Sequence, residues 1–146
     1  MLLLLPKVSL VLAGALALLN IWLSLRVGQV RRSEQVSVGD GGNERVVRRM
    51  RAHANFSENG WIVMLLVLVV ELSLGTSMWL WAAAGLFVVA RLLHGIGMDG
   101  WYAGRSVGTV VTFLLEIALG LWAISIPLTF HAPTTAPVTE AAPAQG

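Results

Sequence analysis

Four apolar stretches separated by polar connections organise the chain. They run from Lys7 to Leu25, from about Gly60 to Leu74, from about Met78 to Met98 and from about Val107 to Phe130. Each lies near the roughly 20 residues that a helix needs to cross about 30 Å of hydrocarbon, although the second needs its polar N-terminal part to reach that length. Since backbone groups in lipid must be satisfied within their own segment, each span is expected to be a helix. The pattern predicts an all-α integral membrane protein, a four-transmembrane-helix bundle over residues 1–130.

The polar connections differ in length and character. The long one, residues 26–56, is rich in arginine and contains the glycine-rich run SVGDGGN at 37–43, which is typical of a flexible linker. Residues 131–146 are rich in Ala, Pro and Thr and are expected to form a disordered tail. The N-terminal apolar run has no basic segment before it and is followed by arginines. We therefore interpret it as a retained span and not as a cleaved signal.

The arginines predict the orientation of the bundle. The 26–56 connection holds seven of them against three acids. By the positive-inside rule this connection is cytoplasmic, which places both termini outside and the 99–105 connection on the cytoplasmic side. We expect the inner membrane of a bacterium, with membrane lipids around the spans. Four aromatic residues fit the interfacial belts of such a protein: Trp79, Trp81, Trp101 and Tyr102.

Composition agrees with a membrane protein and narrows its chemistry. Apolar residues make up 56% of the chain and charged residues 12%, about half the charged share of a soluble domain. The absence of cysteine from the sequence excludes disulfides, a cysteine nucleophile and a thiolate metal site. The three histidines have no metal-binding spacing, and no P-loop or Gly-x-Ser-x-Gly motif is present. We expect neither a bound metal nor a nucleic-acid partner.

A polar stripe enters the second span. At about 100° per residue, Arg48, Asn55 and Glu58 fall within roughly 60° of Arg51 on one helix face, whereas His53 points elsewhere. The stripe is therefore a candidate binding surface. A solvated collar that serves topology alone is the preferred interpretation of four other arginines: Arg26, Arg32, Arg45 and Arg49.

Further polar side chains approach the same depth. Arg31 closes the first span, Arg105 and Ser106 open the fourth, and Arg91 and His94 share a face of the third. Ionisable groups inside a membrane need a partner or a role. For Arg91 the first expectation is a structural ion pair with Glu58, and the second is contact with a ligand. For His94, a packed histidine and a ligand contact remain equally open.

Two acids lie deeper, Glu71 in the second span and Glu116 in the fourth. Their similar depth allows a shared proton or a water-mediated contact, within a subunit or between subunits. The favoured interpretation is that each is protonated or hydrogen-bonded to a neighbouring helix. Neither is assigned to the polar stripe.

The stretch from Arg48 to Glu58, RRMRAHANFSE, resembles the R-x-x-R-A-x-x-N-x-x-E signature of the MAPEG family, membrane-associated proteins in eicosanoid and glutathione metabolism. Three further pieces agree in order: GQVR at 28–31, the GDGGN run at 39–43, and the RLLH run at 91–94 together with the RS pair at 105–106. The last pieces flank the second connection. The resemblance, to bacterial members in particular, covers roughly Lys7 to Phe130.

The resemblance implies a homotrimer that binds glutathione between neighbouring subunits on the cytoplasmic side, with a lipophilic substrate entering from the bilayer. By position, it implies glutathione contacts or support at Arg31, Arg51, Asn55, Glu58, His94, Arg105 and Ser106, with Arg105 and Ser106 stabilising the thiolate. Arg48 joins this set from the stripe. The chain departs from the family at Met98, where eicosanoid enzymes carry tyrosine, at Ala54, and at 59–61, where a proline is replaced by Asn-Gly-Trp.

The residue inventory fits glutathione without the resemblance. Arginines bind carboxylates in forked pairs, Glu58 matches an ammonium group, and a guanidinium with a hydroxyl near sulfur would lower the thiol pKa. The leading hypothesis is therefore a glutathione-dependent transferase or peroxidase acting on lipophilic electrophiles. The alternative is a non-catalytic binder of lipids or partner proteins. A small transport or proton-handling protein, indicated only by Glu71 and Glu116, is a distant third.

Overall fold

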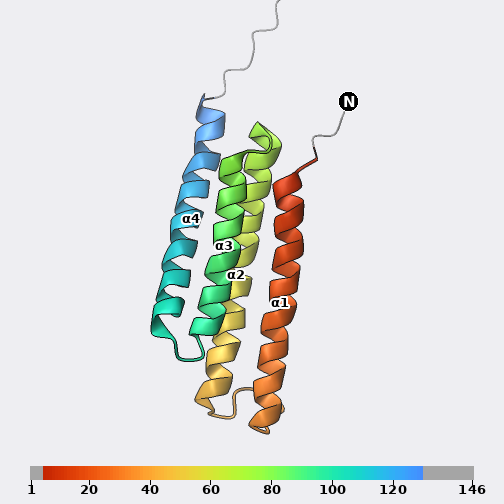
Figure 1. Cartoon of the computed structure of the whole chain (residues 1–146), viewed down its shortest axis with the longest axis vertical. Helices are drawn as coiled ribbons and strands as arrows, with labels where there is room; N and C mark the ends of the chain where they lie inside the picture. The colour runs from red at the N-terminus through yellow and green to blue at the C-terminus, as the bar shows by residue number, and fades with distance from the viewer. Residues whose placement is uncertain (1–4, 130–146) are drawn as a thin grey trace, which may run out of the picture.

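The computed structural model describes residues 5–129, which form four long helices running alternately up and down (Figure 1). The helices are α1 (Lys7–Ser33), α2 (Glu44–Leu74), α3 (Met78–Gly97) and α4 (Tyr102–Thr129). All four are long and apolar enough to cross a membrane, and the described residues include no strand. The predicted all-α bundle of four transmembrane helices is confirmed.

The helices extend further than the apolar runs at one end of the bundle. The connection expected over 26–56 is helical on both sides, and only residues 34–43 lie outside helix. The turn between α3 and α4 is also shorter than expected, because α4 begins at Tyr102. Arg, Glu and Met favour helix as strongly as most apolar residues do, so a helix continues past the hydrocarbon boundary. The tail expected at 131–146 lies outside the described residues.

Side chains cap the starts of α1 and α2. At α2, Asn43 accepts hydrogen bonds from the backbone nitrogens of Arg45 and Val46 at 2.9 and 3.3 Å. The start of α1 is capped from another helix, because Glu71 of α2 accepts from the nitrogens of Val8 and Ser9 at 2.9 and 2.8 Å. A carboxylate at a helix N-terminus satisfies orphan N–H groups and interacts favourably with the helix dipole.

These contacts decide between the two interpretations of Glu71. Its carboxylate is 3% exposed and also accepts from the hydroxyls of Ser9 and Thr76, both at 2.6 Å. The favoured expectation, a hydrogen bond to a neighbouring helix, is confirmed for Glu71. The shared contact with Glu116 is wrong within the subunit, since all four bonds of Glu71 go elsewhere. Glu116 has one buried carboxylate oxygen without a hydrogen-bond partner.

The core is a set of apolar stripes at helical spacing. In α1 the buried positions include Leu12, Leu16, Leu19 and Leu23, and similar stripes from α2 and α3 pack against them. The outward faces are apolar as well, as expected of helices that face lipid. Between α3 and α4 the backbones come closest: a methyl group on Gly108 would lie 2.5 Å from the carbonyl oxygen of Ala90. Small residues at such contacts allow tight packing of membrane helices.

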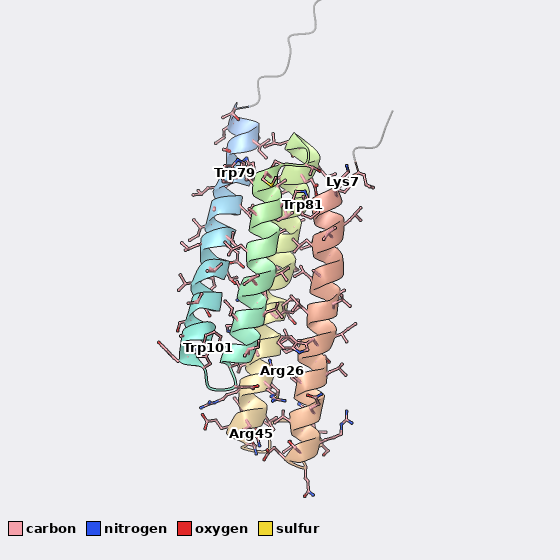
Figure 2. All side chains as sticks on the ribbon, in the orientation of Figure 1. Lys7, Arg26, Arg45, Trp79, Trp81 and Trp101 are labelled. Carbon is pink, nitrogen blue, oxygen red and sulfur yellow. The ribbon has the colours of Figure 1, made fainter. Side chains whose placement is uncertain are left out.

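The two ends of the bundle differ in polarity. Figure 2 shows Lys7, Trp79 and Trp81 at one end and Arg26, Arg45 and Trp101 toward the other. The second end contains the α1–α2 and α3–α4 connections (Figure 1). We call it the basic end, and it is where the polar stripe of α2 begins.

Candidate functional site

A cavity of about 460 Å³ lies at the basic end between the first turns of α2 and the α3–α4 turn. A smaller hollow of about 200 Å³ adjoins it deeper in the bundle, and Arg51, Met98 and Arg105 line both. We call the two together the arginine pocket. The outer part is also lined by Glu44, Val47, Arg48, Gly97, Gly100 and Tyr102, and the inner part by Asn55, His94 and Thr109.

Two cations of this pocket are unneutralised. Arg51 and Arg105 are exposed, and the side chain of neither makes a hydrogen bond or ion pair among the residues that the structure describes. Arg48 differs, because Glu44 accepts from its Nε at 3.0 Å and from its terminal nitrogen at 2.5 Å. Free guanidiniums present forked sets of donors that match carboxylates and phosphates. The pocket is therefore suited to an anionic ligand.

Arg91 lies behind Asn55 and does not line the pocket itself. It is 2% exposed, and its two terminal nitrogens donate to Asn55 Oδ1 at 2.8 Å and to the carbonyl oxygen of Gly108 at 2.9 Å. Among residues 5–129 no Arg91–Glu58 ion pair forms, since both terminal nitrogens of Arg91 bond other groups and Glu58 is exposed. Asn55 and Glu58 lie about 60° apart around α2, which turns Asn55 toward α3 and Glu58 outward.

His94 is a packed histidine, and its contact with a ligand stays a prediction. It is 6% exposed, packed where α3 approaches Gly108 of α4, and it lines the inner part of the pocket. The packing follows from the close approach of α3 and α4. A side chain can be a packed core residue on one side and a pocket wall on the other.

The subunit does not bring together every residue of the predicted site. Arg31 donates to Met50 Sδ at 3.5 Å and to the carbonyl oxygen of Ser37 at 3.4 Å, and lines a separate hollow near residues 35–37. Glu58 and Ser106 do not line the arginine pocket, and Ser106 is half-buried. Arg48, Arg51, Asn55, His94 and Arg105 are the predicted residues that meet in one place.

Two arginines expected to be a solvated collar are instead part of a clamp. Asp99, in the α3–α4 turn, forms ion pairs with Arg26 of α1 and Arg49 of α2. Arg26 also donates to the carbonyl oxygen of Gly95 at 2.7 Å. The clamp ties three helices to the turn that carries Arg105 toward the pocket. The sequence signal for this clamp is Asp99, the single acidic residue of the 99–105 connection. It lies at the same end of the bundle as the basic segments that contain Arg26 and Arg49.

His53, which the helical phase placed away from the polar stripe, joins two helices. Its Nε2 lies 2.8 Å from Asn20 Oδ1, which links α2 to α1 away from the arginine pocket.

No curated protein matches the chain at a significant level. The model of the MAPEG family matches residues 9–125, from the first turn of α1 to the last turns of α4. Because that match covers most of the sequence and all four membrane-length helices, the chain belongs to the MAPEG family.

Proposed function

We propose that the protein is a membrane-bound glutathione-dependent transferase or peroxidase that acts on lipophilic electrophiles. In this proposal it works as a homotrimer in a bacterial inner membrane, with the basic end in the cytoplasm, where glutathione is available. Glutathione is the bound co-substrate, and the lipophilic substrate arrives from the surrounding lipid.

The observation that carries the proposal is the pair of free guanidiniums, Arg51 and Arg105, on opposite walls of one pocket. Glutathione has two carboxylates, one ammonium group and one thiol. The two arginines can bind its carboxylates or stabilise its thiolate, and the cysteine-free chain needs a thiol from outside. A soluble anion reaches the pocket because both arginines are exposed.

The remaining predicted residues fit a site completed by a second subunit. Arg31 is remote from the pocket within one subunit and has a buried Nε without a partner. Glu58, a member of the stripe, is exposed. In a trimer, Arg31 of one copy and the arginine pocket of the next would face the same ligand. Glu58 would then hold the ammonium group.

The chemistry follows from the positive charge of the pocket. A guanidinium beside the thiol favours loss of its proton, and we assign this role to Arg105 with the Ser106 hydroxyl in support. The thiolate attacks the electrophilic carbon, forms the carbon–sulfur bond, and the leaving group departs with its electron pair. The protein's residues bind, orient and stabilise charge, and do not themselves form a covalent intermediate.

Calorimetry of the purified protein in detergent tests the proposal. Wild type should bind glutathione, and Arg105→Ala or Arg51→Ala should weaken binding by roughly tenfold or more, as expected for the loss of a charged hydrogen bond. Arg45→Ala is the control, since it removes the same charge outside the pocket, where Arg45 pairs with Glu34. Absence of binding to wild type would remove the proposal.

One observation favours the non-catalytic alternative. Met98, which stands where the family's eicosanoid enzymes have tyrosine, lines both parts of the pocket, and a thioether cannot donate a hydrogen bond. The thiolate absorbance band of bound glutathione near neutral pH separates the two functions. Its presence supports catalysis, whereas binding without the band supports a binder.

A further inference from the structure

The contact between Arg91 and Asn55 fixes the orientation of the Asn55 side-chain amide. The Arg91 terminal nitrogen lies 2.8 Å from Asn55 Oδ1. A guanidinium has only donors, so the group that faces it must be the amide oxygen. The Asn55 backbone oxygen is also occupied, because Asn59 donates to it at 2.7 Å. The amide nitrogen of Asn55, with its two N–H groups, is left for other partners.

Arg91 is held too firmly to follow a flip of that amide. It is 2% exposed and stacks over Phe87 with 5.7 Å between the guanidinium carbon and the ring centre. Its second terminal nitrogen bonds the Gly108 carbonyl oxygen, which also accepts from Thr112 at 2.8 Å. The bond to Gly108 crosses the tight α3–α4 interface, whereas Phe87 supports the guanidinium from α3 itself. The position of the guanidinium is therefore set by helix packing.

Asn55 stands between this rigid donor and the ligand side of the pocket. It is half-buried and lines the inner part together with Arg51 and Arg105. Arg91 does not line that part. The hydrogen-bonded route from Arg91 to the pocket therefore passes through Asn55.

We propose that Arg91 is a positioning residue that holds the Asn55 amide so that its N–H groups, and not its oxygen, face the arginine pocket. The ligand atom beside Asn55 is then an acceptor, a carboxylate oxygen of the anionic ligand. Asn55 adds a third donor to those of Arg51 and Arg105, and the ammonium group of the ligand lies away from it. The inference rests on the proposed function only in taking glutathione as the ligand.

Two substitutions of Asn55 test the direction of its hydrogen bond. Asn55→Ala removes the donor and should weaken glutathione binding by about tenfold or more, the scale of one bond to a charged group. Asn55→Asp keeps the acceptor toward Arg91 but turns a carboxylate oxygen to the ligand, so it should weaken binding further than Asn55→Ala. If Asn55→Asp instead binds as tightly as wild type, Asn55 accepts from the ligand and the proposal is wrong.

Arg91→Gln tests whether the effect depends on Arg91. A glutamine at 91 can donate or accept, so the Asn55 amide is no longer oriented, and Asn55→Ala should cost less affinity in that background than in wild type. A merely structural role for Arg91 would leave the Asn55→Ala effect unchanged. Thr112→Val is the control, because it removes a neighbouring bond to the same Gly108 oxygen without touching Asn55. It should lower stability and leave glutathione affinity unchanged.

A measurement without ligand separates this proposal from the proposed function. Asn55→Asp places a carboxylate against Arg91. The change in unfolding temperature that this substitution causes in detergent should therefore be more positive in the wild-type background than in the Arg91→Gln background. This difference is expected whether or not glutathione binds. An equal effect of Asn55→Asp in both backgrounds would overturn the positioning role. If Arg91→Gln fails to fold, the two Asn55 variants in the wild-type background decide by binding.

Discussion

Glu71 locks α1 to α2, and its replacement by glutamine should destabilise the bundle far more than a loss of surface charge would. Each carboxylate oxygen accepts one backbone N–H and one hydroxyl, with distances of 2.6 to 2.9 Å. The side chain is 3% exposed, so water cannot easily replace a lost bond. Glutamine has nearly the same shape and removes the charge and one acceptor.

The expected loss of stability depends on which hydrogen-bond donors around residue 71 can reorient. The hydroxyls of Ser9 and Thr76 can rotate to accept from the new amide, whereas the backbone N–H groups of Val8 and Ser9 cannot. At least one N–H therefore faces another donor, which costs about 2–3 kcal/mol for a lost bond to a charged group. The remaining bonds become neutral and the helix-dipole interaction weakens, which adds about 1 kcal/mol. Glu71→Gln should lower the free energy of unfolding by about 3–4 kcal/mol.

Detergent-solubilised protein allows this to be measured by SDS-induced unfolding, followed by circular dichroism. Hydrogen exchange of the peptide containing Val8 and Ser9 should accelerate in the variant, because the first turn of α1 loses its cap. Glu44→Gln makes the same substitution on α2 at a surface ion pair, which is worth only about 0.3–0.5 kcal/mol. If both variants unfold at the same SDS fraction and exchange at the α1 start is unchanged, the capping argument is refuted.

Two further predictions follow from the packing of the basic end and of α4. Asp99→Asn removes the charge shared by Arg26 and Arg49 on a half-exposed surface. It should lower stability in thermal unfolding by about 1–2 kcal/mol at low salt and by less at high salt. A loss of stability that does not depend on salt would contradict the ion-pair account. Gly108→Ala should cost about 1–3 kcal/mol or more, because its methyl group would overlap the Ala90 carbonyl oxygen. The methyl group of Gly120→Ala on the same helix would have no other atom within 4 Å, so this control should be neutral or slightly stabilising. Equal losses of stability in both variants would show that helix propensity, and not close packing, is responsible.

Much of the fold could be predicted because lipid imposes simple rules on sequence. Length and hydropathy are enough to locate a membrane helix, since every backbone group must be bonded within it. The ends of the helices were less predictable. The apolar runs ended at Leu25 and began again at Gly60, but α1 continues to Ser33 and α2 begins at Glu44. The charged residues 26–33 and 44–59 favour helix, so hydropathy alone does not mark where these helices end.

The candidate site was predictable in part for the same reason. A helix of known phase places residues on faces, so Arg51 and Asn55 could be assigned to one surface before any packing was known. The phase does not say which neighbouring helix a face will meet. Arg91 therefore bonds Asn55 and not Glu58, and Asp99 turns two expected collar arginines into a clamp.

The sequence by itself determined that the protein is a bundle of four membrane-length helices with its cations gathered at one end. Those properties depend on local composition and period. The tertiary structure alone decided that Glu71 caps α1, that Arg51 and Arg105 have no counter-ion within residues 5–129, and that Arg91 reaches Asn55. Each of these depends on the relative rotation and height of separate helices, which is set by side-chain packing across their interfaces.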